Sequence, residues 1–146
     1  MENTKGVLAS RNVVAILLVL GCSGQRVEAA EASKFYRLET TASEYGVVGQ
    51  KQIVRVSVTP VGDWKINTQF PAELKVETPV AVQVLKPIQR TKDAAVLRDD
   101  RLEFHIAATP AKAGEYALTL VLKFGLCRQS ECIWRTERVT LHLRVR

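Results

Sequence analysis

The sequence predicts an all-β protein, an antiparallel, immunoglobulin-like β-sandwich of about seven to nine strands, preceded by a signal peptide. Three observations support this prediction. From Lys34 onward, apolar and polar residues alternate with period two. Turn residues such as Pro60-Val-Gly-Asp63 and Thr109-Pro-Ala-Lys-Ala-Gly114 separate the alternating runs. After the first apolar run, no segment repeats with the spacing of an amphipathic helix.

The first residues are typical of an export signal. Lys5 and Arg11 are basic, and Val13–Leu20 is an apolar run too short to span a bilayer. We expect residues 1–21 to be removed, residues 22–33 to form a flexible tether, and residues 34–146 to form the single sandwich domain.

The end of this segment, Val19-Leu20-Gly21-Cys22, resembles the bacterial lipobox. The resemblance implies that Cys22 carries the lipid and that acyl chains hold the protein on a membrane. Ser23 follows the cysteine, which favours the outer membrane over retention at the inner one. The alternative is cleavage near Ala32, which would give a soluble periplasmic or secreted protein.

The chain has a formal net charge of +6, but its cations are spread out rather than clustered. An exported protein rarely meets nucleic acid. We therefore expect no nucleic-acid partner, and instead an envelope protein, a cell-wall polymer or acidic lipid headgroups.

The predicted strands follow one another from Phe35 to the end of the chain. Period-two alternation marks the runs 51–59, 102–106, 116–124 and 139–145, and shorter extended stretches are expected at 35–38, 64–67 and 74–78. Residues 80–85 are expected to be a strand buried on both faces, because Val80, Val82 and Val84 alternate with mostly apolar neighbours. Residues 88–100 are polar and irregular, and we expect a loop there with one helical turn at 94–97.

The two remaining cysteines, Cys127 and Cys132, flank a short polar loop between two strands. If Cys22 is lipidated, these two form a pair, and an oxidising compartment favours a disulfide between them. Closing so small a loop stabilises by only about 2 kcal/mol, so the bridge serves either as a structural clip or as a redox pair that opens without unfolding the domain.

A second resemblance concerns residues 63–71 together with the late cysteine pair. Asp63-Trp-Lys-Ile-Asn-Thr-Gln-Phe-Pro71 followed by Cys127-x4-Cys132 resembles the periplasmic N-terminal domain of DsbD-type thiol–disulfide interchange proteins. The resemblance implies an immunoglobulin-like fold and thiol–disulfide exchange at the pair. The pair spacing is one residue shorter than in that family, no capping loop is recognisable, and no thioredoxin-like domain or transmembrane reductase accompanies the pair.

Other chemistry-bearing residues point to no catalytic or metal site. His105 and His142 stand alone on polar strand faces, and Asp99 and Asp100 lie in a charged loop. Trp64 and Trp134 are expected to pack in the core or at its rim. No cofactor is expected.

The sequence thus predicts a non-catalytic envelope lipoprotein that acts as a binding module, with Cys127–Cys132 as a structural disulfide. The alternative function is periplasmic thiol–disulfide exchange by the same pair.

Overall fold

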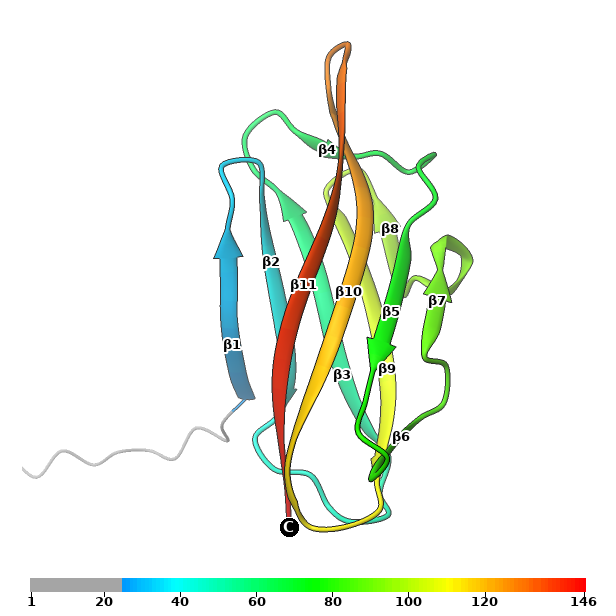
Figure 1. Cartoon of the computed structure of the whole chain (residues 1–146). Helices are drawn as coiled ribbons and strands as arrows, with labels where there is room; N and C mark the ends of the chain where they lie inside the picture. Colours follow the sequence, from blue (N-terminus) through cyan, green and yellow to red (C-terminus); the bar gives the residue numbers. More distant parts are fainter. Residues whose placement is uncertain (1–24) are drawn as a thin grey trace, which may run out of the picture.

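The structure is a computed structural model that describes residues 25–146, with side-chain environments from Ser33 onward. The expected signal peptide, Cys22 and the lipobox lie outside these residues. Two antiparallel sheets form a sandwich (Figure 1). No helix among the described residues has the length and apolarity needed to cross a membrane.

The six-stranded sheet has the order β1-β2-β3-β9-β6, and β8 also pairs with β9. Its strands are β1 (Gln25–Ala32), β2 (Tyr36–Ser43), β3 (Gln52–Pro60), β6 (Val82–Val84), β8 (Val96–Arg98) and β9 (Arg101–Pro110).

The five-stranded sheet has the order β11-β10-β5-β7, and β4 also pairs with β10. Its strands are β4 (Lys65–Ile66), β5 (Glu73–Glu77), β7 (Ile88–Arg90), β10 (Gly114–Arg128) and β11 (Glu131–Val145). A single 3-10 turn, Thr91–Asp93, follows β7.

This strand order confirms the predicted fold class. Strands β2, β3, β9 and β6/β8 take positions A, B, E and D of an immunoglobulin-like sandwich, and β5, β10 and β11 take positions C, F and G. The described part of the chain forms eleven strands, compared with the seven to nine expected; seven have five or more residues and four have three or fewer.

The core lies between the sheets, where the alternation directs every second side chain inward. Phe104 on β9 and Phe124 on β10 are fully buried, and Tyr36 packs edge-on against Phe124 with ring centroids 5.0 Å apart. The Tyr36 hydroxyl donates to Glu137, which joins β2 to β11. Burial, together with the Glu137 carboxylate, raises the pKa of Tyr36 well above its usual value. This contact fixes β2 opposite β11.

Three local expectations differ from the structure. Most of the expected tether is the paired strand β1, because main-chain pairing with β2 requires no apolar alternation. The strand at 80–85 is only Val82–Val84, because Val80 lies in a turn after Pro79 and is fully exposed, as is most of Leu85. The loop expected at 88–100 contains the short strands β7 and β8, because their main chains pair with β5 and β9. Its helical turn is at 91–93 rather than 94–97, where the Asp93 carboxylate accepts the Arg90 N–H at 2.9 Å.

His105 belongs to a polar cluster on the outer face of the six-stranded sheet. Its Nε2 lies 2.6 Å from one carboxylate oxygen of Glu103, and the Arg101 guanidinium donates to the other. Glu103 is buried, at 6% exposure. Burial raises the pKa of Glu103, but the hydrogen bonds from His105 and Arg101 outweigh it and hold the pKa below its usual value.

We expect the Glu103→Gln substitution to lower the free energy of unfolding at neutral pH by about 1–3 kcal/mol, because a charged hydrogen-bonding partner is lost from a buried cluster. A depressed pKa stabilises the fold above the unfolded value of about 4.3, and this contribution is lost as the pH falls through the folded pKa. Urea unfolding at a series of pH values should therefore show that the free energy of unfolding falls less steeply on acidification in the variant than in the wild type.

The control is Glu115→Gln, which removes an exposed carboxylate that pairs with Arg144. It should change stability by less than about 1 kcal/mol. Identical acid profiles for the wild type and Glu103→Gln would contradict a role for ionised Glu103.

Candidate functional site

The disulfide predicted from the sequence joins β10 to β11 near the end of their hairpin. Cys127 and Cys132 are directly opposed in the register, with Cα atoms 4.1 Å apart and a bonded sulfur pair. Arg128 and Glu131 form the next rung, so the turn consists of Gln129 and Ser130. Gln129 has φ +49°, the left-handed conformation that two-residue hairpin turns use. The bridge therefore closes the last rungs of a tight hairpin.

The disulfide lies on the outer face of the five-stranded sheet. Leu122, Phe124 and Leu126 alternate into the core, so Gly125 and Cys127 point the other way. Cys127 is half-buried and Cys132 is exposed. The pair therefore faces solvent rather than the core.

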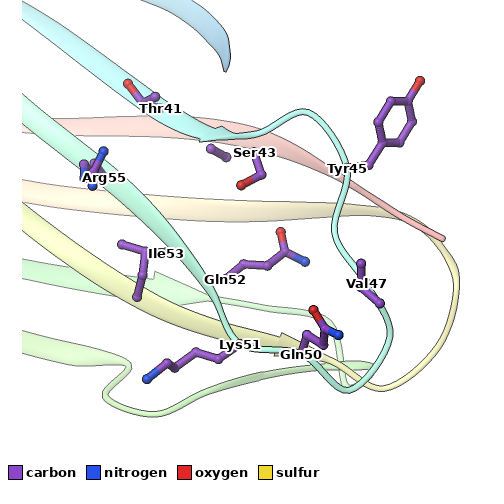
Figure 2. A pocket seen from close by; sticks show the side chains of 10 residues that line it. Thr41, Ser43, Tyr45, Val47, Gln50, Lys51, Gln52, Ile53 and Arg55 are labelled. Atoms are coloured by element: carbon purple, nitrogen blue, oxygen red, sulfur yellow. The ribbon is translucent and has the colours of Figure 1, made fainter. Parts of the chain in front are cut away.

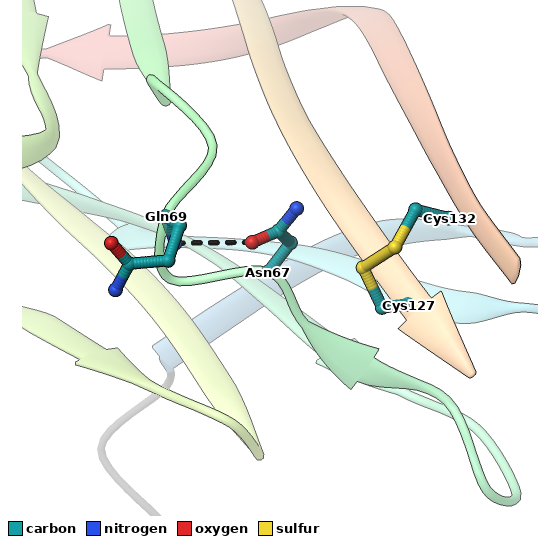
Figure 3. The surroundings of a disulfide bond; sticks show 4 residues. All are labelled: Asn67, Gln69, Cys127 and Cys132. Atoms are coloured by element: carbon teal, nitrogen blue, oxygen red, sulfur yellow. Dashed lines mark hydrogen bonds between the residues drawn. A yellow bond between two sulfur atoms is a disulfide. The ribbon is translucent and has the colours of Figure 1, made fainter. Parts of the chain in front are cut away.

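The segment Asp63–Pro71 runs beside this pair on the far edge of β10. Lys65 pairs with Cys127, and the Asn67 N–H donates to the Gly125 carbonyl at 2.9 Å. Figure 3 shows this loop next to the disulfide, where the Gln69 N–H donates to the Asn67 side chain at 3.1 Å. The structure thus brings together the two segments that carry the DsbD-type resemblance.

Gly125 makes room for Phe70 of this loop. A Cβ at Gly125 would lie 2.8 Å from both Cβ and Cγ of Phe70, closer than real side chains approach. Trp134 stands directly across from Gly125 on β11 and is 71% exposed. The expectation that Trp134 packs in the core or rim is therefore wrong, because the loop that covers Gly125 leaves the Trp134 side chain exposed in the described structure. Trp64 does pack as expected, with Phe35 edge-on against it at 5.2 Å.

Two hollows flank the disulfide. One of about 340 Å³ lies on the Cys127 side, where Asp63, Lys65, Asn67 and Asp99 form part of its lining. A second of about 310 Å³ is lined by Cys132, Ile133, Trp134 and Arg135.

The charges beside the cysteines compensate one another. Arg128 lies 3.1 Å from Glu131 and 3.8 Å from Asp63, and its guanidinium stacks on the Trp64 ring at 4.8 Å. The cation next to Cys127 is therefore neutralised by the anion next to Cys132. This pairing provides no net field that would favour a thiolate.

The other sequence candidates do not join this site. Asp99 reaches the rim of the hollow, where it pairs with Lys65 at 3.6 Å, while Asp100 pairs with Arg98 at 3.0 Å. His105 belongs to the Glu103 cluster, and His142 lies far along β11. Residues 25–146 contain no cluster of three His, Cys, Asp or Glu residues that could hold a metal ion.

A separate hollow of about 410 Å³ lies at the opposite end of the sandwich, between β2, β3 and the loop 44–50 (Figure 2). Sequence reasoning did not identify it. Gln52 is buried there, and neither polar atom of its side chain has a hydrogen-bond partner in the described structure. The amide packs directly against Gly46, where a Cβ would lie 1.7 Å from its nitrogen. Only glycine fits at position 46 with Gln52 in this place.

Comparison with known proteins adds little to this site. No family model matches the sequence, and no curated protein matches it. Among solved structures, the GAE domain of GGA2p from Saccharomyces cerevisiae has a TM-score of 0.46 at 10% identity and covers 81% of this chain and 97% of its own. The yeast GGA1 GAE domain gives 0.44 at 12% identity, covering 81% and 98%.

The fimbrial subunit AggA, the major subunit of aggregative adherence fimbriae type I from Escherichia coli, gives a TM-score of 0.39 at 10% identity, covering 79% of this chain and 98% of its own. With similarity this low, the fold assignment rests on the strand order of the chain itself, and no function is transferred.

We expect Gly125→Ala to lower the free energy of unfolding by about 1–3 kcal/mol, because the new methyl group collides with the base of the Phe70 side chain and must displace the loop. The same substitution in a Phe70→Gly background should cost less, and chemical denaturation of the four proteins measures the difference. Lys123→Ala, on the same face of β10, is the control. Equal costs of Gly125→Ala in both backgrounds would show that Phe70 does not occupy the space above Gly125.

Proposed function

We propose that this chain is a lipid-anchored module of the bacterial cell envelope whose immunoglobulin-like sandwich binds another envelope component, with Cys127–Cys132 as a structural clip. The observation that carries the proposal is the β10–β11 hairpin. Its two strands of 15 residues extend beyond the other strands of the sandwich and end in the bridged turn (Figure 1). A projecting, rigid hairpin that exposes Trp134 is suited to contact with a partner.

The clip has a specific physical task in this proposal. Toward the tip, the inner-face residues of β11 from 133 to 139 are only half-buried, and exposed ladder ends fray readily. A cross-strand bridge at the second rung from the turn opposes this fraying, although closing so small a loop stabilises the whole fold by only about 2 kcal/mol. The compensated charges of Arg128 and Glu131 agree with an inert disulfide.

The second candidate is thiol–disulfide exchange by the same pair. Two observations favour it: Cys132 is exposed, and Asp63–Pro71 lies against β10 beside Cys127. Attack by a partner thiolate requires an accessible sulfur, which an exposed cysteine can provide.

The reduction potential separates the two functions. For a structural clip we expect a potential below about −300 mV, and we expect the Cys127→Ser/Cys132→Ser variant still to bind its partner, though more weakly, while losing about 2 kcal/mol of stability. The potential is measured by equilibrating the full chain with glutathione or dithiothreitol buffers and trapping the free thiols. A potential in the range of the exchange proteins, about −120 to −270 mV, would refute the clip and support redox exchange.

The anchor has its own test. Cys22→Ala should abolish incorporation of labelled fatty acid and release the protein from the membrane fraction, because several acyl chains are needed for stable attachment. Ser23→Ala, which keeps the thiol, should leave labelling intact. Membrane attachment that persists in Cys22→Ala would refute the lipid anchor.

A further inference from the structure

The outer edge of β11 has no neighbouring strand over most of its length. Strand β11 ends the five-stranded sheet and, among the described elements, pairs along its length only with β10. The exception is its C-terminal end, where the Gly46 N–H donates to the Arg144 carbonyl at 2.6 Å and the Arg146 N–H donates to the Gly46 carbonyl at 2.9 Å. A short segment after β2 therefore already adds to this edge.

These bonds identify which main-chain groups face outward. Residues of an antiparallel strand alternate between bonding to the neighbour and pointing away from it. Because Arg144 and Arg146 point away from β10, so do the other even-numbered residues. The open positions are Cys132, Trp134, Thr136, Arg138, Thr140 and His142. Among the described residues their outward N–H and C=O groups have no backbone partner, and one carbonyl, that of Trp134, accepts the Arg135 side chain at 3.3 Å.

On the side of the molecule where β11 ends the five-stranded sheet, the six-stranded sheet extends one strand further. Strand β2 faces β11 through the Tyr36–Glu137 hydrogen bond and through Arg135, whose guanidinium lies 5.2 Å from the Phe35 ring. Strand β1 lies one position beyond β2, so among the described strands none of the second sheet lies opposite it (Figure 1). One added strand beside β11 would face β1 and complete the sandwich.

A second copy of the chain does not fit this place. Pairing of two β11 edges would bring two copies of β1 into the space between two copies of β2. That space corresponds to one interstrand step in the joined sheet, about 4.8 Å, and admits no further strand. The open place therefore suits a single extended segment rather than a second β11 edge.

The side chains next to the open edge define the chemistry of that segment. On the inner face, Ile133 and Val139 are half-buried and pack against the core, and between them lie Arg135 and Glu137, which contact Phe35 and Tyr36. On the outer face, the row from 132 to 142 contains Trp134, Arg138 and His142 and no acidic residue, and Arg138 reaches across β10 to Glu77 of β5, with nitrogen and oxygen 3.2 Å apart. An added strand would bury apolar residues against the first row and place acidic residues beside the second.

We propose that residues 132–142 of β11 accept an extended segment of a partner protein as an additional strand, with alternating apolar and acidic side chains. The inference rests on the proposed binding function and names its surface. Charged side chains such as Arg135, Glu137 and Arg138 keep the edge from pairing indiscriminately. The clip at Cys127–Cys132 holds the far end of the same edge.

The test uses a capped peptide of about nine residues that alternates valine with glutamate, long enough to span most of the open edge. It is titrated into the purified full chain, and amide hydrogen exchange is followed by NMR. We expect slowed exchange at the outward amides of Thr136, Arg138 and Thr140, with little change at Glu137 and Val139. A matched peptide in which lysine replaces glutamate should bind at least about tenfold more weakly, because it places cations beside the Arg138 row.

The discriminating variant is Thr136→Pro, which removes one outward N–H and leaves the pairing with β10 intact, since proline is tolerated where the N–H faces solvent. It should weaken peptide binding about tenfold or more, whereas Thr136→Ala should stay within about twofold. Thr140→Pro with its Thr140→Ala control repeats the comparison if Thr136→Pro does not fold.

Unchanged exchange at the outward amides at saturating peptide, or equal binding by the proline and alanine variants, would overturn the proposal. The titration uses the purified chain, so it does not depend on the anchor. Membrane attachment that persists in Cys22→Ala would refute the lipid anchor alone, whereas failure of the valine–glutamate peptide to bind the purified chain would refute strand addition alone.

Discussion

The ladder between β10 and β11 determines most of what is distinctive in this molecule. It runs without a register shift from Gly114 opposite Val145 to Arg128 opposite Glu131. A slip of one residue would turn every side chain to the opposite face, so the buried leucines of β10 fix the register for the whole hairpin. Cys127 lies opposite Cys132 because the buried leucines of β10 fix the pairing register of the whole hairpin. The disulfide thus reinforces a pairing that the ladder already determines.

The same alternation separates two environments along β10. Leu118, Leu120 and Leu122 supply the second sheet's part of the core, while the opposite face carries Gly125 and Cys127. The missing side chain at Gly125 admits the loop that holds Phe70, and the cross-strand neighbour Trp134 is left without cover. One short stretch of strand therefore packs the core with its even-numbered residues and builds the surface site with its odd-numbered ones.

The sequence predicts the parts of this fold that depend on local alternation, and it fails where long-range position decides. The runs at 51–59, 102–106 and 139–145 are strands because burial on one face requires period two. The Val80–Leu85 run shows the same pattern, yet its ends are exposed, because flanking prolines and a sheet-to-sheet crossing leave only three residues paired. Strand β1 lacks the pattern and forms through main-chain pairing. The exposure of Trp134 and the open edge follow from what lies beside β11, which no local pattern encodes.

The disulfide keeps the open edge of β11 in the extended conformation that strand addition requires. An edge accepts a strand only if its own backbone stays extended, and the section of β11 nearest the tip has the least core beneath it to keep it so. Closing the hairpin at Cys127–Cys132 orders this section before a partner arrives, which reduces the entropy lost on binding. Reduction of the bridge would loosen the tip while Gly46 still held the other end of the edge at Arg144. A structural disulfide on this hairpin therefore contributes to binding through the backbone that it holds extended, even where its contribution to global stability is small.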